Sequence, residues 1–266
     1  MTTTKDTLGI DQVSIGQSFE LAVASGETPN ITYEKIHGRN NDIGTTIEDV
    51  WVAGGIMSWQ QTASVISIVS NSAQDANTTT ATGTRKIKIE GLLAGFTAAT
   101  EIVNLNGTST VTTSNAFIRM NRAYAHEVGT YDGTTTPLHG TVTLTHGSTV
   151  CGVLFVDGSV TCSETQLAKY TVPAGYDAYL SEIHTAVGAN KDATIYFFKR
   201  ENADVVTAPF TARKIVAIFD GLTGSNVMDL HGYRLPEKTD FWLAAKGSAV
   251  NTSIATIFDI ILKRRA

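Results

Sequence analysis

Histidines are the residues of this sequence best suited to metal binding or acid–base chemistry, and their spacing argues against a preformed site. The six histidines are His37, His126, His139, His146, His184 and His231. No two of them are spaced to share one face of a strand or one turn of a helix, which is how short motifs bring paired ligands to a metal ion. His184 follows Glu182 by two residues, a spacing typical of a surface histidine beside a carboxylate. We therefore expect no metal ligand and no cofactor site.

Nucleophile and phosphate-binding motifs are also absent from the sequence. No serine lies in a G-x-S-x-G elbow, and neither G-x-x-x-x-G-K-[ST] nor G-x-G-x-x-G occurs. Glu48 and Asp49 are adjacent carboxylates, and they fit the first turn of a short helix better than an acid–base pair. Carboxylates of a glycoside hydrolase meet in space and not in sequence, so that alternative stays open. We expect a protein that is not an enzyme and has no catalytic residues.

The two cysteines lie in "TVCGVLFVDGSVTC". A two-residue turn at Asp157-Gly158 would place Val153 opposite Cys162, with Cys151 diagonal to Cys162. Diagonal cysteines have poor geometry for a disulfide, so we expect two free thiols. A shifted turn that brings them level remains the alternative.

Composition limits the class of protein. Charged residues make up 17% of the 266 residues and the net charge is −5, against about 25% charged residues in an average soluble domain. Such a chain is not expected to bind nucleic acid directly. No apolar run reaches the length of a membrane span, and "MTTTKDTLGI" lacks a signal-peptide core, so we expect no membrane association and assembly in a cytosol. Low charge fits a surface covered by other subunits, although a β-rich monomer with a neutral surface would share it.

The expected elements are strands and turns. Strand starts recur about every 8–12 residues, which is typical of a β-sandwich or barrel. We predict an all-β fold: an extended N-terminal arm at residues 1–56, a β-sandwich block at 57–163, and a second β-sandwich or jelly-roll-like block at 164–266. "EIVNLNGTSTVTT" predicts a hairpin turning on Asn106-Gly107. "TTIEDVW" predicts one short helical turn capped by Thr45 or Thr46.

Several stretches resemble virion proteins of tailed bacteriophages. The first is "KIHGRNNDIGTTIEDVWVAGGIMSW", in which a K-x-G-R-N-like start leads to an acidic turn, a tryptophan and a Gly-Gly pair. "TASVISIVSNSAQDANTTTATGTRKIKIEGLL" follows, and "EIVNLNGTSTVTTSNAFIRMNRAY" is the most specific segment. "KYTVPAGYDAYL" and "RLPEKTDFWLAAK" complete the pattern in order. The resemblance covers about residues 35 to 262.

This resemblance implies a structural subunit of the virion, located in the virion and assembled in the host cytoplasm. We expect a head decoration or cement protein that binds the major capsid protein or other virion subunits. We also expect it to form a homo-oligomer, with a trimer favoured, and to carry no cofactor. Its arm would add a strand to a neighbour and insert Trp51 as an aromatic anchor, with Arg39, Glu48 and Asp49 as polar partners. The alternative for Trp51 is packing within its own domain.

Two other functions share the same sequence features. The chain could be a tail, baseplate or fibre-attachment component of the virion. It could also be a receptor- or glycan-binding module, with Trp59, Tyr124, Tyr131 and Trp242 as candidate sugar-stacking residues.

Overall fold

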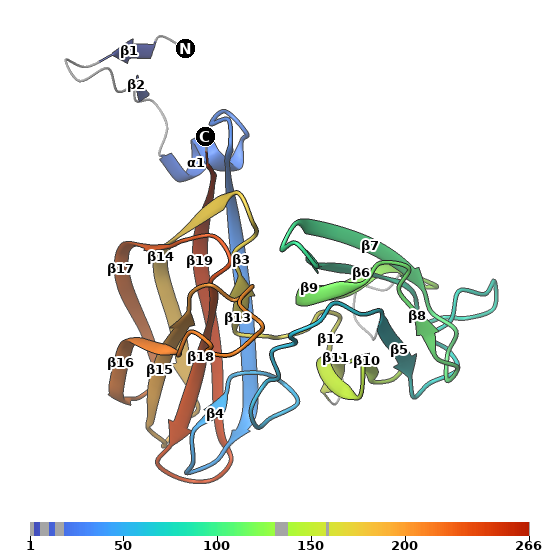
Figure 1. Cartoon of the computed structure of the whole chain (residues 1–266). Coiled ribbons are helices and arrows are strands. Elements are labelled where there is room, and N and C mark those ends of the chain that lie inside the picture. Colours follow the sequence, from blue (N-terminus) through green and yellow to red (C-terminus); the bar gives the residue numbers. More distant parts are fainter. Residues whose placement is uncertain (1–2, 6–10, 14–18, 131–137, 158–159, 266) are drawn as a thin grey trace.

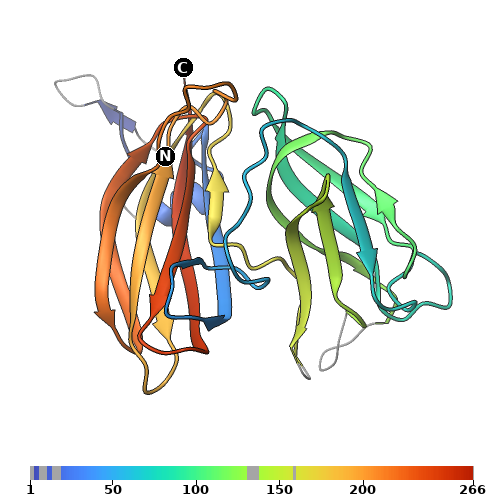
Figure 2. The ribbon, with the colours of Figure 1, turned by 60° about the horizontal axis from the view of Figure 1, so that its bottom comes forward.

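The computed structural model describes residues 3–5, 11–13, 19–130, 138–157 and 160–265. Antiparallel strands dominate it, and they form two β-sandwiches side by side (Figures 1 and 2). This confirms the predicted all-β fold. Ahead of the sandwiches the described chain forms β1 (Thr3–Lys5), β2 (Asp11–Val13) and the short helix α1 (Phe19–Ala24).

The larger unit is formed by residues 31–56 and 164–265, and we call it the base sandwich. Its four-stranded sheet has the order β17-β14-β19-β3, with bounds β17 (Ser225–Leu235), β14 (Tyr176–Val187), β19 (Thr252–Arg264) and β3 (Ile31–Ile43). Its five-stranded sheet has the order β13-β18-β15-β16, with β4 beside β18. The bounds are β13 (Lys169–Thr171), β18 (Asp240–Gly247), β15 (Ala193–Arg200), β16 (Lys214–Leu222) and β4 (Glu48–Asp49).

The second unit lies between β4 and β13 in the chain, and we call it the inserted sandwich (residues 57–163). Its five-stranded sheet has the order β12-β11-β10-β5-β8, with bounds β12 (Val160–Cys162), β11 (Thr149–Asp157), β10 (Val142–His146), β5 (Ile66–Ser70) and β8 (Val111–Thr112). Its three-stranded sheet has the order β7-β6-β9, with bounds β7 (Ala98–Asn104), β6 (Thr84–Leu93) and β9 (Phe117–Val128).

The predicted arm is corrected by the pairing of β3 and β4. β3 pairs along its length with β19, with His37 opposite Ile257, and β4 pairs with β18. β3 and β4 are therefore strands of the base sandwich and not part of an extended arm. The sequence did not reveal this, because β3 is polar and one of its inward positions is a glycine, Gly38. Ala168 packs so closely there that an added Cβ would collide with it.

Two local predictions also differ from the structure. Residues 45–51 form no helical turn, since Glu48 and Asp49 are the short strand β4. Gly107 does have a left-handed backbone (φ +58°) at a tight turn between Asn106 and Ser109. That turn does not close a hairpin, because β7 and β8 belong to different sheets.

The base sandwich has its own core, and β18 lies at its centre. Phe241 contacts Phe197 and Phe258, with ring centroids 6.0 and 5.5 Å apart. Each such fully buried side chain contributes about 1.5–3 kcal/mol through removal of apolar surface from water. Alternate residues of β18, Trp242 and Ala244, face the other way into a second apolar cluster. β18 is thus buried on both faces, which explains its nearly continuous apolar run.

The second apolar cluster joins the two sandwiches. It contains interior residues of the inserted sandwich, such as Ile87, Ile89 and Phe117, together with Phe198 and Trp242 from the outer face of the base sheet. As predicted, Ile87 and Ile89 share one buried face of β6. The outer face of the five-stranded base sheet is therefore a packing surface for the inserted sandwich. Among the helices of the described chain, none has the length and apolar character needed to cross a membrane.

Candidate functional site

The segment from Asn40 to Gly55 closes on its own chain. Glu48 accepts hydrogen bonds from two backbone amides, through Oε1 from Gly44 N (3.0 Å) and through Oε2 from Gly55 N (3.0 Å). Gly55 has φ +68°, a left-handed conformation that glycine adopts without strain. The buried Asn40 side chain accepts from Asp42 N at 2.9 Å. One glutamate thus fixes both ends of this turn, a structural role within the chain.

Trp51 packs inside the molecule. Its side chain is only 5% exposed, and its Nε1 donates to Gly55 O at 3.2 Å. The residue also forms an isolated β-bridge with Leu167 and belongs to the apolar cluster between the sandwiches. The hypothesis that Trp51 inserts into a neighbouring subunit is therefore wrong, because the turn held by Glu48 directs the indole to its own chain.

Asp49 is buried beneath the same turn. Its Oδ2 accepts from Met57 N at 2.6 Å, and Trp242 donates a second hydrogen bond to it. Burial raises the pKa of this carboxyl to about 6, against the lowering effect of those hydrogen bonds and of the nearby Lys169. Asp49 is thus a partner of its own chain too, and the hypothesis that it faces a neighbouring subunit is wrong.

Arg39 and Glu48 reach the molecular surface. Arg39 is half-buried, and its Nε donates to Asn41 Oδ1 at 2.7 Å in a contact that is open to solvent. Both side chains line a pocket of about 240 Å³, which Phe155 and Gln166 also line. Their contact with a partner stays a prediction.

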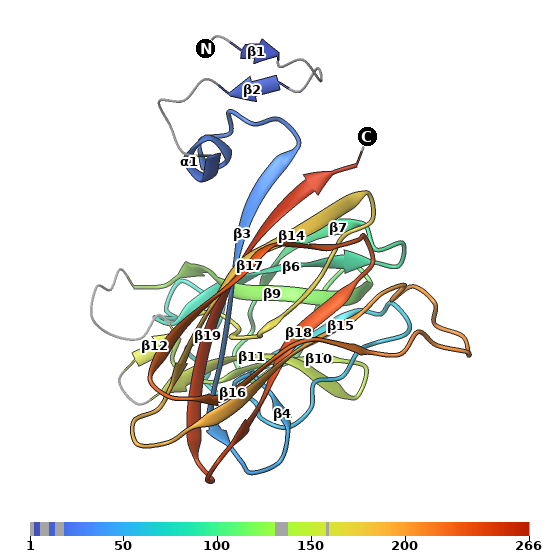
Figure 3. The same ribbon diagram turned by 90° about the vertical axis from the view of Figure 1, so that its left-hand side faces the viewer.

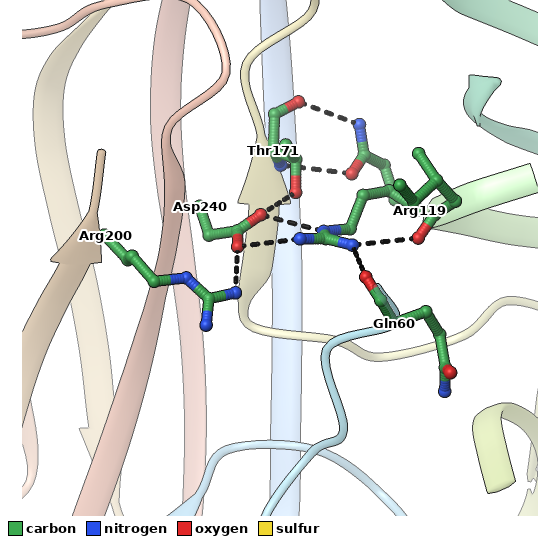
Figure 4. A network of polar contacts seen from close by, with 7 residues as sticks. Gln60, Arg119, Thr171, Arg200 and Asp240 are labelled. Carbon is green, nitrogen blue, oxygen red and sulfur yellow. Dashed lines mark hydrogen bonds and ion pairs between the residues drawn. The ribbon is translucent and has the colours of Figure 1, made fainter. Parts of the chain in front are cut away.

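A buried ionic contact joins the two sandwiches (Figure 4). Arg119 on β9 of the inserted sandwich donates from Nε and Nη2 to the carboxylate of Asp240 on β18, at 2.9 and 3.0 Å. Asp240 is fully buried and also accepts from Thr171 Oγ1 at 2.7 Å and from Arg200 Nη2. The remaining guanidinium nitrogen of Arg119 donates to the backbone carbonyls of Gln60 and Ile118. This bidentate geometry fixes the orientation of one sandwich on the other.

A second polar contact runs parallel to the first. Asn121 Nδ2 donates to Thr171 O at 3.2 Å, and Thr171 N donates back to Asn121 Oδ1 at 3.1 Å. Because the amide replaces a missing strand partner at the edge of β13, it connects β13 of the base sandwich to β9 of the inserted sandwich. We call the set Arg119, Asn121, Thr171, Arg200 and Asp240 the junction.

Trp59 lies beside the junction and is surrounded by cations. Arg119, Lys169 and Arg200 lie 5.5, 5.3 and 5.8 Å from its ring centroid, and the ring packs on Trp242 at 5.2 Å. Complete burial lowers the pKa of Lys169. The electron-rich ring face partly compensates for positive charge that is removed from water.

A cavity of about 370 Å³ lies on another side of the contact between the sandwiches. Glu34 on β3, Glu90 and Arg122 line it together with apolar residues. Burial, and then the negative charge of Glu90, raise the pKa of Glu34. Tyr124 donates to Glu90 Oε1 at 3.0 Å. Arg122 in turn pairs with Glu164, Nη2 donating to Oε2 at 3.1 Å, so the charges around the cavity are partly paired.

Metal binding and sugar binding were the other functions that the sequence left open. His184 lies 2.9 Å from Glu182 at the surface, which confirms the predicted pair. Within the described ranges, no group of three or more His, Cys, Asp or Glu side chains could hold a metal ion. Of the candidate sugar-stacking residues, Trp59 and Trp242 pack on each other, Tyr124 binds Glu90, and Tyr131 lies outside the described residues.

Cys151 is a free thiol, as predicted, and burial raises its pKa to about 11. The predicted register of its hairpin was wrong by two residues, because Asp157 pairs with Val160 and Cys162 lies opposite Phe155. The turn residues 158–159 and the side chain of Cys162 lie outside what the structure describes.

The junction residues were not identified as a site from the sequence, although the motifs contained all of them except Arg200. "FIRMNRAY" carries Arg119 and Asn121, and "KYTVPAGYDAYL" carries Lys169 and Thr171. "RLPEKTDFWLAAK" carries Asp240. Three of the segments on which the phage resemblance is based therefore meet at one place. An arginine within an apolar strand and an aspartate beside "FWLAA" were the available signal, since buried charges are normally paired.

No protein-family model matches the chain, and no curated protein matches it. Among solved structures, one described as the structure of infectious bursal disease virus Gx strain aligns at 11% identity with a TM-score of 0.23, over 89% of this chain and 77% of that chain. The structure of the Gt strain of the same virus aligns at 12% identity and a TM-score of 0.21, over 89% and 78% of the two chains. The crystal structure of the VP2 subviral particle of infectious bursal disease virus gives 10% identity and a TM-score of 0.21, over 89% and 77%. TM-scores this low do not identify a shared fold, so the function proposed below is based on the chain's own residues.

Proposed function

We propose that the chain is a non-enzymatic structural subunit of a tailed-phage virion, and that it binds the head as a decoration or cement protein. One observation carries the proposal: the segments that resemble phage virion proteins converge on the buried junction between the sandwiches. The residues behind the resemblance therefore hold a two-sandwich body in one shape. A subunit that works through repeated contacts needs such a fixed shape more than it needs a reactive cleft.

The partners that follow are the major capsid protein or other virion subunits, with a homo-oligomer as the working form. The surface around Arg39 on β3 and Glu48 on β4 is the one we assign to a heterologous contact, since both side chains line the same pocket. Trp51 has no part in this contact, because it is buried in its own chain.

Immuno-electron microscopy of purified particles tests the location. Antibody fragments raised against the chain should label the head surface in a regular array. Labelling confined to the tail or baseplate would replace the decoration assignment with a tail one. Absence of the chain from purified particles, measured by mass spectrometry, would overturn the virion assignment.

The cement role has a separate test. Particles assembled without the chain should release DNA at a lower temperature than complete particles, and adding the purified chain should restore the original release temperature. Equal release temperatures would remove the cement role.

A further inference from the structure

The cavity between the two sandwiches has the size of a small-ligand site. Its volume of about 370 Å³ lies within the range of about 300–1,000 Å³ that is usual for such sites. β3 and β13 of the base sandwich form one wall, and β6, β7 and β9 of the inserted sandwich form the other (Figures 1 and 3). Ala98 and Thr100 on the edge strand β7 line the cavity and are exposed, so the cavity opens to solvent there.

One carboxylate of this cavity has no partner. Glu34 lies on the same side of β3 as Ile36, the side that faces the interior. Within the described chain, Glu34 forms no hydrogen bond and no ion pair. Its neighbour Lys35 lies on the opposite side of β3 and pairs with Asp259 at 3.1 Å. A carboxylate that is partly removed from water without a partner is unfavourable, and a ligand with a positive charge would supply that partner.

A buried hydroxyl group lies beside that carboxylate. Tyr170 on β13 is only 7% exposed, and its ring packs on Phe241 with the centroids 5.8 Å apart. The residue also lines the cavity. Burial, followed by the negative charges of Glu34 and Glu90, raises the pKa of the phenol, which places the hydroxyl near both carboxylates. Among the described residues this hydroxyl has no hydrogen-bond partner, although buried tyrosines usually have one.

The positive charges near the cavity are already paired with other groups. Arg122 donates from Nη2 to Glu164 at 3.1 Å, and Lys88 lies 3.2 Å from Glu90. The charge of Arg122 lowers the pKa of Glu34, but burial and the charge of Glu90 outweigh it. The cavity therefore keeps a negative charge at Glu34 that no described side chain pairs with.

These groups select a primary ammonium group on a short apolar chain. Such a group carries three N–H donors, which match the Glu34 carboxylate and the oxygen of the Tyr170 hydroxyl. Quaternary ammonium ions bind to ring faces, but the ring of Tyr170 is packed in the core. A calcium ion needs about six to eight oxygen ligands, and the described residues offer no group of three or more acidic, histidine or cysteine side chains for a metal. The rest of the wall is apolar and suits methylene groups: Ile36, Leu92, Ala98, Ala99 and Pro173.

We propose that this cavity binds a linear primary alkylamine. Its ammonium group pairs with Glu34 and donates to the Tyr170 hydroxyl, and its methylene chain packs on the apolar wall. The site is separate from the junction and lies within one chain, so it does not rest on the proposed function. Because both sandwiches form its walls, the bound amine also stabilises the folded chain.

Isothermal titration calorimetry of the full chain with 1,4-diaminobutane tests the proposal. The wild-type chain should bind the diamine saturably, and Glu34→Gln should weaken binding by about tenfold or more because it removes the counter-ion. Tyr170→Phe removes only the hydroxyl and should weaken binding by about threefold or more. Ala98→Trp fills the cavity from an exposed position and should abolish binding. Circular dichroism should show that each variant keeps the wild-type fold.

Glu182→Gln provides a matched control, since it makes the same change at a surface glutamate that pairs with His184. It should bind the diamine like the wild type. Three further compounds test the ligand class: 1,4-butanediol has the chain without the charge, tetramethylammonium has the charge without N–H donors, and calcium chloride supplies a metal ion. Each should bind at least about tenfold more weakly than the diamine.

Three results would overturn the proposal. The first is a wild-type chain that shows no saturable binding of the diamine up to about 10 mM. The second is a Glu34→Gln variant that binds as tightly as the wild type. The third is a butanediol, tetramethylammonium or calcium affinity equal to that of the diamine, which would mean that the cavity does not recognise a primary ammonium group.

Discussion

β18 and β16 belong to the same sheet, with only β15 between them, yet their outer faces have different surroundings. On β18, Trp242 is buried against the inserted sandwich and Asp240 is fully buried in the junction. On β16, Ile215 and Ile218 continue the same apolar face into solvent. The difference shows that apolar character alone does not determine burial. Coverage ends where the inserted sandwich ends, and the apolar face at β16 stays exposed.

Substitutions on the covered strand β18 should lower the stability of the chain most, and Asp240→Ala should have the largest effect. Removal of this carboxylate leaves Arg119 and Arg200 without their shared counter-ion. Leaving one partner of a buried ion pair unmatched costs about 3–5 kcal/mol. Urea unfolding of the purified chain should show a loss of that size.

Asp204→Ala serves as its control, because Asp204 pairs with Lys238 at the surface. The control should lower the free energy of unfolding by less than about 1 kcal/mol. Equal losses in the two variants would mean that the junction contributes no more than a surface pair.

The pH dependence of stability tests the burial of Asp49 next to the covered face. Its folded-state pKa of about 6 lies above the ordinary value of 3.8, so the folded state binds the proton more tightly than the unfolded state does. The stabilising contribution is therefore fully present below the ordinary pKa and is lost as pH rises through about 6. The difference of about two pKa units corresponds to about 3 kcal/mol.

Asp49→Asn isolates this contribution, because asparagine does not titrate. The free energy of unfolding of wild type minus that of the variant should fall by up to about 3 kcal/mol between about pH 4 and pH 7. A difference that stays constant over this range would show that Asp49 is solvated in the folded chain.

A smaller effect is expected where the turn of residues 44–55 closes over the same sheet. Glu48→Ala removes the acceptor of the Gly44 and Gly55 amides, and Glu48 is partly exposed, so the loss should be about 1 kcal/mol. Thermal unfolding can detect it. Ile47→Ala on the same turn changes an exposed apolar residue and should have no comparable effect.

Substitutions on the uncovered strand β16 should hardly change the stability of the monomer. Ile218→Ser removes an exposed side chain from β16, and such surface changes usually alter stability by less than about 0.5 kcal/mol. Chemical unfolding of the purified chain is the measurement. A loss of several kcal/mol would show that β16 is covered within the monomer, and the contrast with β18 would disappear.

Short-range features were predictable from the sequence, and long-range partners were not. The alternation of "RKIKIEGLL" identified β6 and its buried face at Ile87 and Ile89, because a strand repeats every two residues. β3 was taken for part of an arm, since its partner β19 lies more than two hundred residues later. No local pattern indicates such a pairing.

The junction also depends on long-range partners that no local pattern predicts. Arg119 and Asp240 are 121 residues apart, so their pairing becomes visible only in the fold. What the sequence did allow was the inference that a charged residue in an apolar strand has a partner. Trp51 was identified as an important aromatic residue, but the direction of its side chain is set by hydrogen bonds of Glu48 to two glycine amides. Side-chain spacing alone does not encode that direction.

The insertion of one sandwich into the other also sets the order of events on the ribosome. All strands of the inserted sandwich end by Cys162, so they can pair while β14 to β19 are still unmade. β3 emerges earlier than any of them, yet its partner β19 begins only at Thr252. Arg119 likewise awaits Asp240. A nascent chain therefore holds half of an ion pair until β18 is synthesised, and closure of that pair marks the moment at which the two halves become a single body.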